Sequence, residues 1–163
     1  MEVLMAIVIL GIISVIASTI FFTSIKGSNK TTAINNIKQN GSYAMDIMTR
    51  MIRNARSVGV GGSYVSLVNP DKGVTTFMCG DNNGDGLLDI ASNSAFLSSV
   101  LISATTVPRI EIENCDEVFA LNSGEPGVYP DVVTINFTLQ QTEVYAAEGG
   151  TMTFVNSVSL RNY

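Results

Sequence analysis

One short stretch of the chain, CGDNNGDGLLDIAS at residues 79–92, has side chains that could bind a metal ion. Oxygen-bearing residues recur at alternate positions in the spacing D-x-N-x-D-G-x-x-D, which matches the first nine positions of an EF-hand-type calcium loop. In that pattern the oxygens surround a hard cation, a glycine permits the sharp turn, and a backbone carbonyl at the seventh position joins the shell. The ligands that this spacing predicts are Asp81, Asn83, Asp85, the carbonyl of Leu87, and Asp89.

A second interpretation of the same stretch stays open. The twelfth position, where an EF-hand loop has a bidentate glutamate, is Ser92, so that Asp89 or Asn93 would have to substitute. Asn, Asp and Gly are also the usual residues of ordinary turns. The sequence therefore predicts either a weak Ca²⁺ site, with Ca²⁺ as the protein's one cofactor, or a polar turn without a cation.

The cysteine and histidine content limits the kinds of catalytic and metal site that this chain can form. Two cysteines, Cys79 and Cys115, favour one disulfide bond in an oxidising compartment, with two buried free thiols as the alternative. The chain has no histidine, which excludes histidine acid–base catalysis and histidine metal sites. No nucleophile–base pair and no carboxylate dyad is recognisable, so we predict that the protein is not an enzyme and has no catalytic residues.

Charge is distributed unevenly along the chain. Residues 1–57 hold six basic and two acidic side chains, whereas residues 58–163 hold three basic and twelve acidic ones. Binding to nucleic acid requires Lys and Arg side chains that neutralise phosphates. The acidic C-terminal region therefore predicts no specific nucleic-acid partner.

The N-terminal segment MEVLMAIVILGIISVIASTIFF has a single charge, Glu2, and no other charged residue precedes Lys26. A run of about 20 apolar residues is long enough to cross the hydrocarbon core of a membrane. A secretory signal peptide would begin with basic residues and have a shorter apolar core. An ordinary membrane anchor accounts for the length but not for Glu2, because a carboxylate beside lipid is costly.

This segment resembles the N-terminal helix of bacterial type IV pilins and type II secretion pseudopilins. The sequence Glu2-Val3-Leu4 matches the Glu-Val-Leu of that family, and Gly11 matches a glycine common in its apolar helix. Two positions depart from the pattern. Only Met1 precedes the glutamate, and Thr19 stands where a proline is often found.

The resemblance implies a pathway of processing and assembly. A prepilin peptidase would remove a basic leader, and the helix would anchor the subunit in the cytoplasmic membrane as a single pass. Pilus assembly machinery would then pack the helix against copies of itself in a helical filament on the cell surface. Met1, Glu2 and Gly11 would belong to the assembly surface, with Glu2 paired to the N-terminal amine of a neighbour. Such pairing sets the axial register, since an unpaired buried carboxylate is costly.

The function that the resemblance implies is that of a structural subunit of a type IV pilus, which polymerises through its apolar helix. A type II secretion pseudopilin and a minor or tip pilin remain alternatives, because length and signature do not separate these roles. A membrane-anchored enzyme is the least favoured alternative.

The fold class expected from these elements is α+β, with a long N-terminal helix packed on an antiparallel β-sheet domain, as in the pilin fold. The division is 1–24 for the apolar helix, 25–57 for its amphipathic half and 58–163 for a β-rich outer domain.

From Ile34 to Ala55 apolar residues recur at three- and four-residue steps, which predicts a helix that continues to about Ser57. Gly27 and Gly41 are its expected soft points, and Asp46 and Arg50 are spaced to form an ion pair. Strands are expected at 64–68, 74–78, 96–103, 109–113, 117–121, 132–139 and 151–160.

Overall fold

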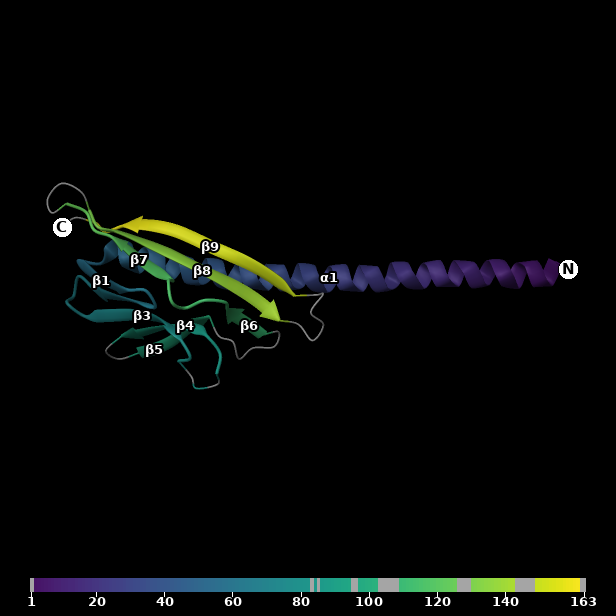
Figure 1. Ribbon diagram of the computed structural model, residues 1–163, viewed down its shortest axis with the longest axis horizontal. Helices are drawn as coiled ribbons and strands as arrows, with labels where there is room; N and C mark the ends of the chain where they lie inside the picture. The colour runs from purple at the N-terminus through teal and green to yellow at the C-terminus, as the bar shows by residue number, and fades with distance from the viewer. Residues whose placement is uncertain are drawn as a thin grey trace.

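The computed structural model describes residues 2–82, 84, 86–94, 97–102, 109–125, 130–142 and 149–161. A single long helix, α1 (Glu2–Asn54), extends from one end of the molecule, and a β-rich body packs against its C-terminal half (Figure 1). The α+β prediction is therefore confirmed. The strands are β1 (Ser57–Gly61), β2 (Tyr64–Val68), β3 (Val74–Gly80), β4 (Asp89–Ser94), β5 (Leu97–Ile102), β6 (Arg109–Ile112), β7 (Phe119–Asn122), β8 (Val132–Thr142) and β9 (Gly150–Ser159).

Helix α1 is continuous over 53 residues, which corresponds to a length of about 80 Å at 1.5 Å per residue. It ends at Asn54, three residues before the predicted end at Ser57. The Ala55 amide bonds back to the Ile52 carbonyl, and the Arg56 amide then bonds to the Val68 carbonyl of β2. The backbone therefore joins a sheet directly after the last helical turn.

The strands form two antiparallel sheets. The first is a five-stranded meander in the order β1-β2-β3-β4-β5. In the second, β6 and β7 pair with different parts of one edge of β8, and β9 pairs along the other edge. Helix α1 contacts β8 and β9 of the second sheet and β5 of the first. Both sheets therefore pack against the same half of the helix.

Two strands, β1 and β4, are not predicted by the sequence pattern. The segment at 58–62, expected only to end the helix, forms β1, where Val58 pairs with Leu67 and Val60 with Val65. The residues of β4 fall at the end of the predicted metal loop, but Ile90 and Ala91 are buried between β3 and β5. Pairing with β2 makes a strand of the β1 segment, and pairing with β3 and β5 makes one of the β4 segment, although both are short and weakly patterned.

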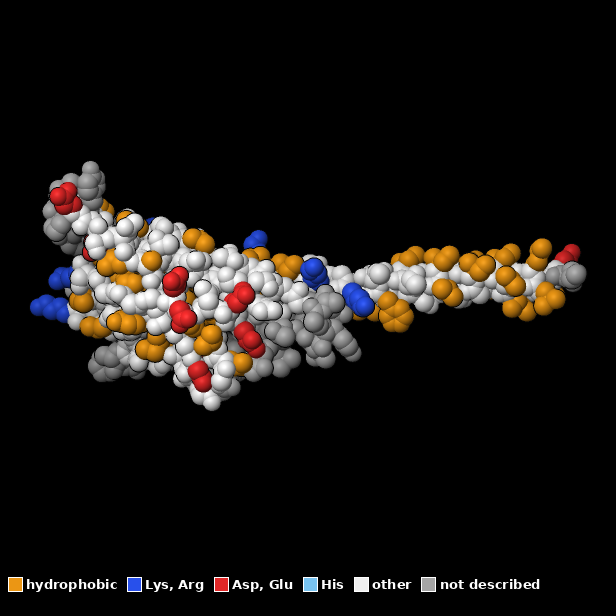
Figure 2. Space-filling view, in the orientation of Figure 1, with side chains coloured by type: hydrophobic (Ala, Val, Ile, Leu, Met, Phe, Trp, Pro, Cys, Tyr) orange, Lys and Arg blue, Asp and Glu red, His pale blue; other side chains and the backbone are white. Residues whose placement is uncertain are grey.

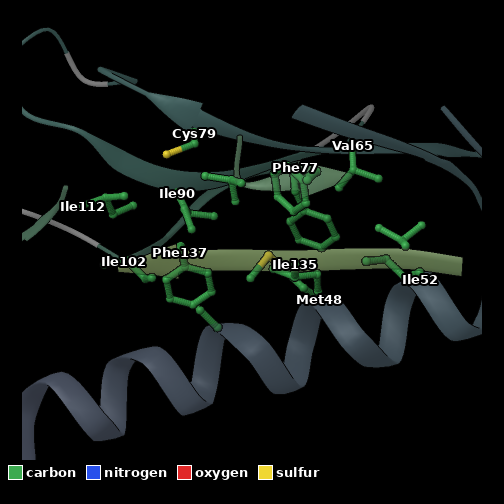
Figure 3. Packing of buried hydrophobic residues seen from close by; sticks show 14 of the residues in the cluster. Met48, Ile52, Val65, Phe77, Cys79, Ile90, Ile102, Ile112, Ile135 and Phe137 are labelled. Atoms are coloured by element: carbon green, nitrogen blue, oxygen red, sulfur yellow. The ribbon is translucent and has the colours of Figure 1, made fainter. Parts of the chain in front are cut away.

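The core lies between the C-terminal half of α1 and the two sheets (Figure 3). The buried helix positions recur every three or four residues and are Ala33, Ile37, Gly41, Ala44, Met48 and Ile52. This face agrees with the predicted periodicity, except that Ile34 and Met45 at its margins are only partly buried. In Figure 3, Met48 and Ile52 point from the helix toward Phe77 and Val65 of the first sheet. The core is thus built on the second half of the helix alone.

Gly41 is not a soft point in the helix. It is buried, and the ring of Phe154 on β9 lies directly over its Cα, where a Cβ atom would overlap three ring atoms. Phe154 in turn stacks on Phe137 of β8, with ring centroids 5.3 Å apart. The glycine therefore permits the close approach of helix and sheet. Gly27, by contrast, lies within the unbroken helix, and a Cβ atom added there would meet nothing within 4 Å.

Candidate functional site

The first half of α1 is an apolar arm, which we define as residues 2–25, that packs against no other described part of the chain. Its large apolar side chains from Val3 to Phe22 are 53–74% exposed. Figure 2 shows these side chains around the arm, with basic side chains where the arm meets the body and acidic ones on the body. A soluble monomer rarely exposes an apolar surface of this extent. The arm is also the one described helix segment that is long and apolar enough to span a membrane.

Four hydroxyl groups within the arm, those of Ser14, Ser18, Thr19 and Thr23, donate to backbone carbonyls of the helix that carries them. Ser14 donates to the Leu10 carbonyl, and Ser18 donates to the Ser14 carbonyl, each at 2.8 Å. Thr19 and Thr23 make the same kind of bond to carbonyls three or four residues earlier. This back-bonding hides polar hydrogens that would be costly in an apolar environment. The arm is therefore chemically suited to lipid or to a packed bundle of helices.

Two residues expected at an assembly surface are placed on this arm. Glu2 is exposed and begins the helix, where a carboxylate is favoured by the helix dipole. Gly11 has nothing within 4 Å of the place where a Cβ atom would lie, so no contact in the described part of the chain requires a glycine there. Met1, the third residue expected at this surface, lies outside the described residues.

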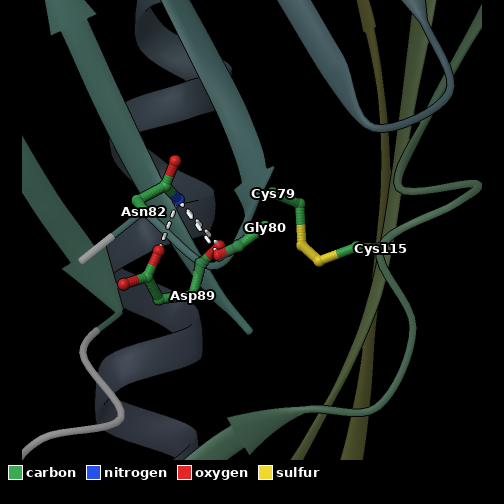
Figure 4. Close-up of a disulfide and its surroundings, with 5 residues drawn as sticks. All are labelled: Cys79, Gly80, Asn82, Asp89 and Cys115. Carbon is green, nitrogen blue, oxygen red and sulfur yellow. Dashed lines mark hydrogen bonds between the residues drawn. A yellow bond between two sulfur atoms is a disulfide. The ribbon is translucent and has the colours of Figure 1, made fainter. Parts of the chain in front are cut away.

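The predicted disulfide bond is confirmed. Cys79 at the end of β3 and Cys115 after β6 are bonded, with Sγ atoms 1.96 Å apart (Figure 4). Both residues are buried, and the bond joins the first sheet to the second. The bond therefore holds the end of β3, and the start of the loop that follows it, close to the second sheet.

The acidic loop, residues 81–88, connects β3 to β4 as the end of a hairpin whose last pair is Gly80 with Asp89. The Asp81 carboxylate accepts the backbone N–H groups of Gly84 and Gly86, at 2.7 and 3.0 Å. Both glycines have positive φ, near +80°, a conformation that other residues rarely adopt. Leu88 is partly buried and packs on the core. The first predicted ligand is thus held by backbone groups at two described positions of its own loop.

Asp89 is the predicted ligand with the most unusual environment. It is only 1% exposed, at the first position of β4. The Asn82 side chain donates to the Asp89 Oδ1 atom and also to the Gly80 and Asp89 carbonyls (Figure 4). No hydrogen-bond donor from the described residues reaches the other carboxylate oxygen, Oδ2. A buried carboxylate oxygen in this state has lost its water without gaining a partner.

The remaining predicted ligands are placed only in part. Asn83 and Asp85 lie outside the described residues, and the residues that are described contain no group of three acidic or sulfur ligands around one point. Ser92 is inside β4, where its hydroxyl donates to the Ser99 carbonyl. Asn93 is four residues along the strand from Asp89, about 13 Å at the usual rise, which is too far to substitute as a ligand.

Sequence reasoning missed the role of Asn82 and the burial of Asp89. The second position of a calcium loop is not a ligand position, so the spacing provides no reason to single out Asn82. The burial of Asp89 depends on β4 being an inner strand, which the sequence pattern does not predict. The exposed pair of Arg50 and Asp46, in contrast, forms as predicted, at 2.7 Å.

No family model, no curated protein and no solved structure matches this chain.

Proposed function

We propose that this protein is a structural subunit of a type IV pilus-like filament, anchored in the cytoplasmic membrane before assembly and polymerised through its apolar arm. The observation that supports this most directly is the arm itself, whose large apolar side chains are exposed all around the helix while four of its hydroxyl groups bond to the helix backbone. A surface of this kind requires either lipid or other apolar helices around it. Copies of the same arm satisfy that requirement once the subunit leaves the membrane.

The arrangement of charge supports the same proposal. A membrane anchor has no need of a carboxylate at its apolar end, whereas a bundle of staggered copies can pair Glu2 with the N-terminal amine of a neighbour. The pairing would act mainly on register, because the cost of removing both charges from water offsets much of their attraction. Leader removal by a prepilin peptidase and delivery by pilus assembly machinery belong to this proposal.

Substitution of Glu2 tests the proposal. Glu2→Ala should leave the body folded and the subunit membrane-anchored, because Glu2 contacts no part of the core, but filament yield should fall sharply. Glu2→Gln is the matched control for side-chain size, and it should also assemble poorly because it lacks the charge. Filaments sheared from cells would be counted by electron microscopy, with the membrane fraction probed for subunit. Normal filament yield from Glu2→Ala would contradict the registration role.

Truncation tests the role of the whole arm. A chain that begins at residue 25 keeps every buried helix residue, since burial starts at Ala33, and it should be a folded, soluble monomer. Size-exclusion chromatography and sedimentation would measure its state. If this truncated chain still formed filaments, the β-rich body and not the arm would drive assembly. The abundance of the subunit in filaments sheared from cells then separates the alternatives. A major pilin would be the main component of that material, whereas a minor pilin or a pseudopilin would not.

A further inference from the structure

We propose that the β3–β4 loop binds a calcium ion where the loop meets β4, with the Oδ2 atom of the buried Asp89 as a ligand. This site is independent of filament assembly and would exist in a free subunit. The argument rests on Asp89, because its carboxylate is buried and has a partner at only one of its two oxygens among the described residues. A cation is the partner that such an oxygen lacks.

The hairpin brings the first and ninth positions of the calcium spacing to the same end of the sheet. Gly80 and Asp89 are paired across β3 and β4, so Asp81 directly follows one member of the pair and Asp89 is the other. The N–H groups of Gly84 and Gly86 hold the Asp81 carboxylate at the centre of the turn. Such an oxygen can accept a hydrogen bond and coordinate a cation at the same time.

Asn82 acts as a positioning residue for this site. Its amide group donates to Asp89 Oδ1 and to two backbone carbonyls, which fixes the rotation of the carboxylate and leaves Oδ2 as the oxygen available to an ion (Figure 4). Groups that orient a ligand in this way contribute to metal affinity without touching the metal. The Leu87 carbonyl is a further oxygen that the spacing supplies, and the other two ligand positions of the spacing, Asn83 and Asp85, lie outside the described residues.

The ligand chemistry selects calcium among the common metal ions. The chain has no histidine, and both of its cysteines are in the disulfide bond, so the nitrogen and thiolate ligands of zinc and copper are missing. Carboxylate and carbonyl oxygens suit hard cations, and an irregular loop suits calcium better than magnesium, which demands octahedral geometry. Because the twelfth position is Ser92 and not a glutamate, the bidentate twelfth ligand is absent, and the dissociation constant should be near the 10⁻⁴–10⁻³ M usual for extracellular modules, as an order of magnitude.

Thermal unfolding of the full chain in detergent micelles, with calcium or with chelator, tests the site. At a calcium concentration about ten times the dissociation constant, the unfolding equilibrium constant should fall about elevenfold, because calcium binds the native state alone. Magnesium at the same concentration should give a smaller shift, and calorimetric titration of the wild-type chain should show one calcium site. An equal effect of both ions would indicate screening of the acidic surface and would overturn the proposal, as would the absence of any calcium effect.

Asp89→Asn identifies the ligand. The substitution keeps an oxygen for the Asn82 amide and removes the buried charge, so the variant should be at least as stable as wild type in chelator and should lose the calcium response. The matched control is Asp71→Asn, in the β2–β3 turn, where the side chain likewise accepts a backbone N–H group, from Gly73. That control should keep the full response. An Asp89→Asn variant that folds and responds to calcium as wild type does would show that Asp89 is not a ligand.

Discussion

The contact between Gly41 and Phe154 provides a sharp test of how helix and sheet are joined. A Cβ atom at position 41 would overlap the tip of the Phe154 ring. A phenylalanine ring at a surface could swing aside, but this ring is stacked on Phe137, which is completely buried. Gly41→Ala should therefore force a displacement of the ring, of β9, or of the helix.

The size of the effect follows from comparing two glycines of the same helix. Overpacking of a well-packed core costs about 1–3 kcal/mol. Replacing a helical glycine with alanine gains up to about 1 kcal/mol, because alanine loses less backbone entropy on folding. Gly27→Ala obtains that gain with no clash, since nothing lies within 4 Å. The propensity gain cancels between the two variants, so Gly41→Ala should be less stable than Gly27→Ala by about 1–3 kcal/mol.

Thermal unfolding of the full-length variants in the same detergent, followed by near-ultraviolet circular dichroism, would measure this difference. For a chain of this size 1 kcal/mol corresponds to about 2–4 °C in the midpoint, so the two variants should differ by about 4–8 °C near the middle of the range. Far-ultraviolet spectra should be alike, because both substitutions favour the helix. The midpoint of Gly27→Ala should equal or exceed that of wild type.

A second substitution shows whether the ring is the cause. In a Phe154→Leu background the clash is relieved, and Gly41→Ala should then cost no more than Gly27→Ala in that background. A double-mutant cycle gives the coupling between positions 41 and 154 directly. If Gly41→Ala were as stable as Gly27→Ala in the wild-type background, the close packing of β9 on this helix turn would be refuted.

Three further results are expected from the same unfolding assay. Replacing both Cys79 and Cys115 with serine should lower the free energy of unfolding by about 4 kcal/mol, because the bond spans 36 positions of the unfolded chain; an unchanged midpoint would contradict this. Met48→Ala should cost about 2–5 kcal/mol, since Met48 is fully buried between helix and sheets, and a loss below about 1 kcal/mol would argue against that packing. Arg50→Ala should change stability by less than about 0.5 kcal/mol, because its ion pair with Asp46 is exposed, and a larger loss would point to contacts beyond that pair.

The local sequence pattern was sufficient to predict the helix and strands whose periodicity is strong. The apolar run after Glu2 and the three- and four-residue recurrence from Ile37 to Ile52 predicted one helix with two different halves, and α1 has that form. The alternation in VVTINFTL likewise predicted β8. The cysteines were few enough that pairing between Cys79 and Cys115 was the simplest outcome. Each of these inferences depends on neighbours in sequence or on residue counts, so no knowledge of the tertiary fold was needed.

Tertiary contacts decided the features that depend on partners distant in sequence. The glycine-rich segment of β1 and the polar segment of β4 are strands because β2, β3 and β5 pair with them. The same pairing buries Asp89 and places Asn93 along β4, too far from the loop to substitute for the missing twelfth ligand. Gly41 could be read from sequence only as a weak point in the helix. The ring that requires a glycine there comes from β9, more than a hundred residues later, and only the packed fold brings the two together.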